Sequence, residues 1–156
     1  MHLAFKSYEI IMKGGHNLKD IALILLSHGN MACETLKSAE MIVGKIGNAY
    51  ALSMDTNEGM NGISSKLENL LTDISEKYKH IFVIADLLGG TPCNVAIKKM
   101  AHMNNVTLIS GLNLTMVIEF AMSQYDDYEK LKKHLIEVGR TGIKDILDDL
   151  KNNLDE

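Results

Sequence analysis

Four short, mostly apolar runs recur along the chain from residue 21 onward. They are Ile21–Leu26, Tyr50–Met54, Ile81–Ala85 and Val106–Ser110. A run that does not alternate between apolar and polar positions fits a strand whose two faces are both buried, as in a parallel sheet. The pattern therefore predicts four strands inside a parallel sheet.

The segments between these runs carry apolar residues at helical spacing, with charged residues between them. These segments are residues 32–43, 63–78 and 92–103. Thr115 is expected to cap a fourth helix, and from Asp126 onward the chain is polar with apolar residues again at helical spacing. Each predicted strand is therefore followed by a predicted helix.

Strands and helices alternate four times, with short connections and no internal linker. Crossovers between parallel strands are right-handed and place helices on both faces of the sheet. The sequence predicts one α/β domain over residues 20–156, a three-layer, doubly wound, flavodoxin-like fold with a mostly parallel sheet. Residues 1–19 show no clean period, and we interpret them as an N-terminal extension, either a tag or the result of an alternative start at Met12.

Composition narrows the class of protein without changing this fold. The 156 residues are 46% hydrophobic and 23% charged, and a chain of this size buries roughly 70% of its unfolded surface without a disulfide or metal. The net charge of −4 argues against a nucleic-acid partner. No apolar run approaches the ~20 residues of a membrane span, and the two cysteines form no CxxC pair. We expect a cytoplasmic protein with no metal site.

Several nucleotide motifs are missing from the sequence. The string GxxxxGK[ST] does not occur, which argues against ATP hydrolysis by a P-loop, and no GxG dinucleotide fingerprint is present. The hydroxyl-rich turn of a flavin-phosphate loop is absent after the first predicted strand. We therefore expect no cofactor.

Two residues with catalytic potential stand where predicted strands end. His28 follows the first apolar run and Asp86 follows the third. Reactive groups of open α/β sheets collect at the carboxyl ends of strands, and strands one and three are neighbours in the flavodoxin-like order. A carboxylate that accepts a hydrogen bond from one imidazole nitrogen leaves the other nitrogen free as a nucleophile. It also stabilises the positive charge that develops when that nitrogen attacks an electrophile such as a phosphoryl group.

The segment after Asp86 could hold phosphoryl oxygens. Gly89 and Gly90 allow close backbone approach, Thr91 can cap a helix, and Pro92 suits a first helical turn, where free amides attract anions. Gly29 similarly leaves room beside His28. Each feature also has an ordinary structural explanation. The histidine could be a polar residue whose hydrogen bonds are simply satisfied, the aspartate could cap a turn, and GGTP could be an ordinary connection from a strand to a helix. The residues alone leave both interpretations open.

The remaining histidines are interpreted as surface residues. They are His2, His16, His80, His102 and His134.

Three strings together resemble a known family. ILLSHGNMA, VIADLLGGTPCN and VTLISGLNLTMVIE are similar to the IIA component of the mannose/fructose/sorbose family of the bacterial phosphoenolpyruvate:sugar phosphotransferase system. The resemblance runs from about Ile21 to Ile146. It implies that His28 is phosphorylated by the phosphocarrier protein HPr and passes the group to a IIB component. Asp86 would orient the imidazole, and the Thr91 hydroxyl would line the phosphoryl site.

The resemblance also carries expectations about assembly. Members of the family are typically cytoplasmic homodimers that exchange an edge strand, although here the C-terminal segment has a helical pattern. Sugar specificity is expected to lie in the membrane components IIC and IID, which this chain would serve indirectly.

Two alternatives stay open. One is the related phosphotransfer subunit that feeds dihydroxyacetone kinase, against which the GGTP loop argues. The other is a regulatory binding module controlled by phosphorylation, although the acidic cluster of a receiver domain is missing after the first strand.

Overall fold

The computed structural model describes residues 20–125 and 127–152, so the proposed extension over residues 1–19 lies outside the described residues. All four predicted strands form, and they pair in parallel in the order β2-β1-β3-β4. The strands are β1 (Ile21–His28), β2 (Ala49–Met54), β3 (His80–Ala85) and β4 (Val106–Ser110). This order is the flavodoxin-like order predicted from the sequence, with strands one and three side by side.

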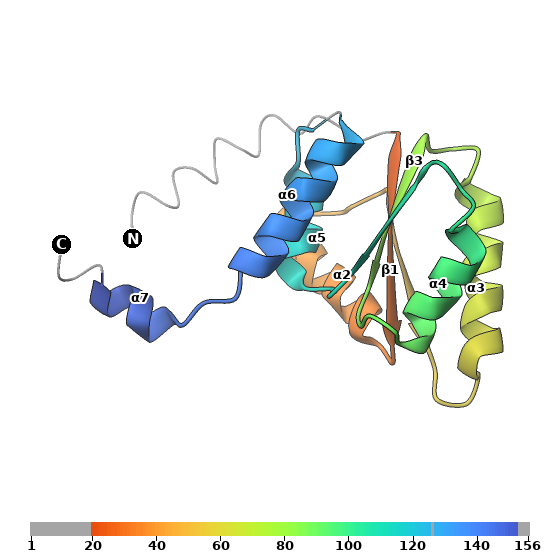
Figure 1. The fold of residues 1–156 in the computed structure, drawn as a ribbon, viewed down its shortest axis with the longest axis horizontal. Helices are drawn as coiled ribbons and strands as arrows, with labels where there is room; N and C mark the ends of the chain where they lie inside the picture. Colours follow the sequence, from red (N-terminus) through yellow and green to blue (C-terminus); the bar gives the residue numbers. More distant parts are fainter. Residues whose placement is uncertain (1–19, 126, 153–156) are drawn as a thin grey trace.

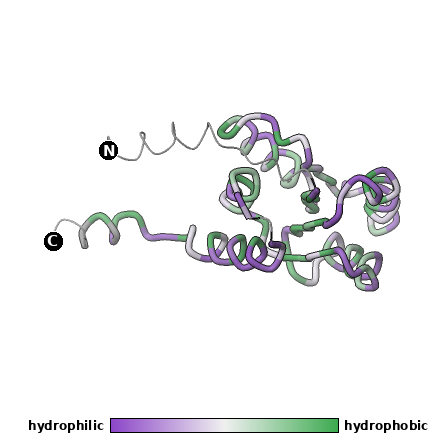
Figure 2. Tube along the Cα trace, turned by 90° about the horizontal axis from the view of Figure 1, so that it is seen from above, coloured by the Kyte–Doolittle hydropathy of each residue, from purple (hydrophilic) through white to green (hydrophobic). Residues whose placement is uncertain are grey.

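Six helices cover the sheet or follow it in this part of the chain. They are α2 (Met31–Val43), α3 (Gly59–Ile74), α4 (Thr91–Met100), α5 (Leu114–Met122), α6 (Tyr128–Thr141) and α7 (Ile146–Asn152). Helices α2, α5 and α6 lie on one face of the sheet, and α3 and α4 lie on the other (Figure 1). Figure 2 shows the same layers from above, with α7 standing apart from them. The predicted three-layer α/β fold is confirmed.

Strand β1 shows why continuous apolar runs predicted this fold. Leu23 and Leu25 pack against the α2, α5 and α6 side, whereas Ile24 and Leu26 pack against the α3 and α4 side. All four side chains are fully buried. Burial of one such side chain contributes about 1.5–3 kcal/mol, so both faces of the central strand favour the same two-sided packing.

Several helix boundaries differ from the prediction, and two of them have a clear cause in side-chain contacts. Helix α5 is capped by Asn113, whose side chain accepts a hydrogen bond from the backbone N–H of Met116 at 3.1 Å, so the expectation that Thr115 is the cap was wrong. Helix α3 ends at Ile74, before Tyr78, whose hydroxyl lies 3.0 Å from that of Tyr50. A side-chain contact with β2 therefore takes over where the helical pattern continued.

The interpretation of His80 as a surface residue was also wrong. His80 is only 8% exposed, its Nε2 lies 2.8 Å from Thr107 Oγ1, and its ring stacks on Tyr128 with centroids 4.2 Å apart. The ring also contacts Phe82 in a tilted arrangement. Because α6 begins at Tyr128 and folds over the start of β3, a histidine in a polar stretch of sequence becomes buried.

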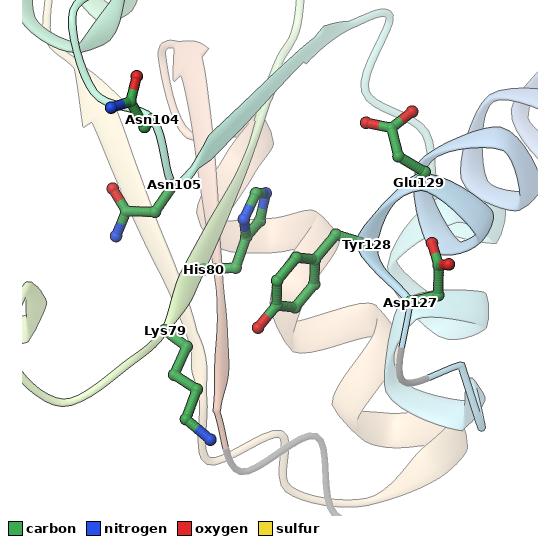
Figure 3. Close-up of a pocket in the computed structure, with 7 residues that line it drawn as sticks. All are labelled: Lys79, His80, Asn104, Asn105, Asp127, Tyr128 and Glu129. Carbon is green, nitrogen blue, oxygen red and sulfur yellow. The ribbon is translucent and has the colours of Figure 1, made fainter.

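A groove of about 440 Å³ lies beside this stack, as the close-up in Figure 3 shows. Its lining residues are Lys79, His80, Asn104, Asn105, Asp127, Tyr128 and Glu129. His80 opens β3 and pairs with Ile21 at the start of β1. The groove therefore lies at the amino ends of the strands, and His28 lies at the opposite end of the sheet.

Of the other histidines, His134 is half-buried, with its Nε2 2.9 Å from Glu119 Oε2, and His102 is exposed. His2 and His16 lie outside the described residues.

Candidate functional site

The strand order brings the two candidate catalytic residues together. His28 is the last residue of β1, and Asp86 directly follows β3, which is the parallel neighbour of β1. Leu26 pairs with Ala85, so the segments that follow β1 and β3 leave the sheet at the same end, the carboxyl ends of the strands. There the Nδ1 atom of His28 lies 2.8 Å from Oδ2 of Asp86.

The carboxylate of Asp86 is held in place by three contacts. Oδ2 accepts from the backbone N–H of His28 at 2.8 Å as well as contacting the ring, and Oδ1 accepts from the backbone N–H of Leu87 at 2.8 Å. An ionised carboxylate only accepts hydrogen bonds, so the imidazole nitrogen that contacts it must be the donor. Neutral His28 therefore carries its hydrogen on Nδ1 and has a lone pair on Nε2. The His28 side chain is 42% exposed, which leaves the ring accessible from solvent.

Gly90 lies against the His28 ring. A Cβ atom at position 90 would stand 2.7 Å from Cε1 and 3.6 Å from Nε2 of His28. The shorter distance is below any ordinary carbon contact, so a side chain at this position would displace the imidazole. The sequence indicated glycine here for backbone approach to phosphate, and the structure adds that the imidazole itself occupies the space.

The other predicted site residues lie in the same two loops. Gly29 and Gly89 have φ values of 51° and 80°, the left-handed region that glycine adopts without strain. Thr91 is the first residue of α4. The N-cap of this helix is Gly90, so no side chain makes a cap hydrogen bond there. The expectation that Thr91 caps this helix was therefore wrong. Pro92 lies in the first turn, as predicted.

Asn94 is a residue of this loop that the sequence analysis did not single out. Its Nδ2 donates to the carbonyl oxygen of Gly89 at 2.8 Å, and its backbone N–H donates to that of Gly90 at 2.9 Å. It therefore closes the glycine loop from the first turn of α4. The signal available in the sequence was a side-chain amide four residues after Gly90 in GGTPCN.

Two helices begin next to His28. Helix α2 starts at Met31, and its N-cap Asn30 makes no side-chain cap bond; α4 starts at Thr91. First-turn amides without intrahelical partners favour anions at such termini. Exposed apolar side chains border the same edge at Met31, Leu87 and Leu88. This end of the sheet thus combines an exposed imidazole, polar donors and apolar contact surface.

Neither a metal centre nor a membrane span emerges from the described residues. Within residues 20–125 and 127–152, no group of three or more histidine, cysteine, aspartate or glutamate side chains could hold a metal ion. No helix in the same part of the chain is long and apolar enough to cross a bilayer.

An open parallel sheet with an oriented histidine at a strand end is an arrangement suited to phosphotransfer. Residues 22–136 match the family described as the PTS system fructose IIA component, and the chain belongs to this family of phosphotransferase-system proteins. The resemblance inferred from the sequence motifs is thereby confirmed.

Individual relatives agree with this assignment. The chain is 29% identical over 131 residues to the fructose-specific EIIA component of Bacillus subtilis, covering 84% of this chain and 80% of that protein. It is 29% identical over 126 residues to the mannose-specific EIIAB component of Escherichia coli, covering 80% of this chain but 39% of that longer protein. The solved mannose/sorbose-specific IIA subunit from Enterococcus faecalis is 39% identical, with a TM-score of 0.72, over 81% of this chain and 95% of that one.

Proposed function

We propose that this chain is the phosphoryl carrier of a bacterial sugar phosphotransferase system. His28 accepts a phosphoryl group from phosphorylated HPr and passes it to a IIB component, which serves sugar uptake through the membrane components IIC and IID. The observation that carries the proposal is the 2.8 Å contact between Nδ1 of His28 and Oδ2 of Asp86 in a member of the IIA family. This contact leaves Nε2 as the nucleophile.

The transfer is a displacement at phosphorus. The Nε2 lone pair of His28 attacks in line, the bond from phosphorus to the nitrogen of the donor breaks, and its electron pair returns to the donor imidazole. The new P–N bond leaves positive charge on the His28 ring, which the carboxylate of Asp86 stabilises through Nδ1–H. The same steps in reverse order deliver the group to the IIB component. Such transfers depend mainly on positioning and electrostatics.

The two loops beside His28 supply the surroundings of the phosphoryl group. Gly29, Gly89 and Gly90 let the backbone approach its oxygens, and the Thr91 hydroxyl and the first-turn amides of α4 act as donors. No cofactor or metal takes part in this scheme.

Docking uses the exposed apolar side chains of Met31, Leu87 and Leu88, which border the site. Because donor and acceptor must reach the same Nε2 atom, HPr and the IIB component bind this surface in turn. From family membership we also infer a cytoplasmic homodimer. The relatives are named as fructose-specific and mannose-specific components, which favours this function over transfer to dihydroxyacetone kinase or a purely regulatory role.

The experiment that tests the proposal follows the phosphoryl group. HPr carrying ³²P is mixed with wild-type protein, His28→Ala and His102→Ala, the last removing an exposed histidine away from the site. We expect labelling of wild type and His102→Ala but not of His28→Ala. Label retained in His28→Ala would overturn the acceptor assignment. Chasing the labelled protein with IIB or with the kinase subunit decides between the two acceptors.

A further inference from the structure

Ser27 is a buried polar residue inside an apolar strand. It is fully buried, it directly precedes His28 in β1, and all six strand residues before it are apolar. A buried hydroxyl is costly unless its hydrogen bonds are satisfied. Its presence at this position therefore calls for an account of what the hydroxyl binds.

The hydroxyl bridges the two sides of the turn that contains His28. Its oxygen accepts a hydrogen bond from the backbone N–H of Ala32 at 2.7 Å, and it donates to the carbonyl oxygen of Gly29 at 3.2 Å. The formal N-cap of α2, Asn30, makes no side-chain cap bond. Ser27 thus supplies from the strand the acceptor that an N-cap side chain would otherwise provide.

This turn determines where the imidazole lies. The backbone N–H of His28 and its ring Nδ1 both contact Oδ2 of Asp86, so a movement of the backbone moves the ring relative to the carboxylate. On its other side the ring stands against Gly90, at a distance that leaves no room for a side chain. Small displacements of residues 28 and 29 therefore change the alignment of Nε2.

We propose that Ser27 is a positioning residue for phosphoryl transfer, acting on His28 through the turn over residues 28–32. The inference rests on the proposed function, because it assigns Ser27 a role in the reaction at His28. Ser27 itself is fully buried and acts only through the alignment of the imidazole.

The neighbouring strand offers a matched control. Ser53 pairs with Ser27 in the register of β1 and β2, but its hydroxyl lies 3.2 Å from Sγ of Cys33, and no described hydrogen bond joins that side chain to the His28 turn. Ser27→Ala and Ser53→Ala therefore remove the same group from adjacent strands. Only the first removes a group bound to the turn.

The test measures single-turnover transfer from phosphorylated HPr and the ¹⁵N NMR spectrum of the His28 imidazole. In Ser27→Ala we expect the maximal rate to fall roughly tenfold to a hundredfold with little change in the HPr concentration for half-maximal rate. The hydrogen should also be less strictly confined to Nδ1. Ser27→Thr, which keeps the hydroxyl, should recover most of the rate, and Ser53→Ala should leave both measurements unchanged.

Two results would overturn the inference. One is a wild-type rate and imidazole spectrum in Ser27→Ala; the other is an equal change in Ser53→Ala. If Ser27→Ala does not fold, Ser27→Cys, which keeps the shape but has only a weak S–H donor, takes its place with the same expectations. Failure of the proposed function would appear separately, as phosphoryl uptake by His28→Ala.

Discussion

The two ends of the sheet each hold a histidine, and the two residues behave differently. His28 ends β1, its side chain is 42% exposed, and its ring contacts the carboxylate of Asp86. His80 begins β3, is 8% exposed, and contacts the hydroxyl of Thr107 while its ring stacks on Tyr128. Both histidines therefore lie at the end of a strand, and they differ in the residues that surround them.

The surroundings decide which chemistry is open to each ring. A carboxylate partner fixes the hydrogen on Nδ1 of His28, and the glycine at position 90 leaves the other side of the ring without a covering side chain. Around His80, aromatic rings from β3 and α6 cover the imidazole, and burial lowers its pKa. The first arrangement suits nucleophilic attack, whereas the second suits packing of α6 against the sheet.

The largest expected effect comes from replacing each imidazole in turn. His28→Gln should abolish phosphoryl uptake and change the free energy of unfolding by less than about 1 kcal/mol, because the side chain lies at the surface, with 42% of it exposed. His80→Gln should lower the free energy of unfolding by about 1–3 kcal/mol, through loss of the ring stack and the bond to Thr107, with the transfer rate per folded molecule unchanged. Urea unfolding and transfer assays measure both. Loss of transfer in fully folded His80→Gln would contradict the assignment of transfer to His28 and of packing to His80.

Gly90→Ala tests the side of the His28 ring that lies against Gly90. The added methyl group would meet Cε1 at 2.7 Å, so the ring must move away from its position beside Asp86. We expect transfer to slow by roughly a hundredfold, since a misplacement of about 1 Å has effects of this size. Gly47→Ala, where a Cβ atom meets nothing within 4 Å, is the control and should transfer at the wild-type rate. Equal rates in the two variants would show that the contact does not position the ring.

Asp86→Asn tests the partner of the ring. The amide is uncharged and can donate as well as accept, so it neither fixes the hydrogen on Nδ1 nor stabilises the positive ring. Transfer should slow by roughly a hundredfold, the lower end of the effect of losing one electrostatic contact in the transition state. Asp73→Asn, an exposed aspartate on α3, provides the control in the same single-turnover assay. Unchanged kinetics in Asp86→Asn would remove the proposed role of the carboxylate.

The contrast also explains how far the sequence predicted the site. Apolar runs predicted the strands because both faces of a parallel sheet are buried, and the usual strand order then predicted that His28 lies beside Asp86. Local sequence patterns are therefore enough to predict the strands and the pairing of His28 with Asp86. Gly90 was expected to be a loop glycine, but its contact with the ring depends on how two loops meet across the sheet.

What could not be predicted depends on contacts that side chains make only in the folded chain, some with distant segments and some with nearby backbone. His80 is surrounded by polar residues in the sequence, and only the return of α6 places Tyr128 on its ring. Ser27 directly follows the first apolar run in the sequence, and only the structure shows that its hydroxyl accepts from the backbone N–H of Ala32 in the first turn of α2. In each case a polar side chain acquires its role from tertiary packing, which neither periodicity nor spacing records.

The smallest expected effect is a pH dependence of stability that belongs to His80. Burial lowers the pKa of this imidazole, and the nearby charges of Glu129 and Lys132 act in opposite directions with smaller effect. The unfolded chain, in which the histidine titrates near 6.5, therefore binds the proton more readily than the folded protein. The stabilising contribution is fully present above that pH and is lost as the pH falls below it.

Urea unfolding at pH 7.5 and pH 5.5 should consequently show a larger loss of stability in the wild type than in His80→Gln, because the variant has no imidazole to protonate at this position. The difference should be smaller than the effect of the substitution itself at pH 7.5, because the stack with Tyr128 contributes packing at every pH. Equal losses in the two proteins would mean that other groups carry the acid sensitivity. The distinction between the two histidines would then rest on geometry alone, with no separate role for the burial of a neutral ring.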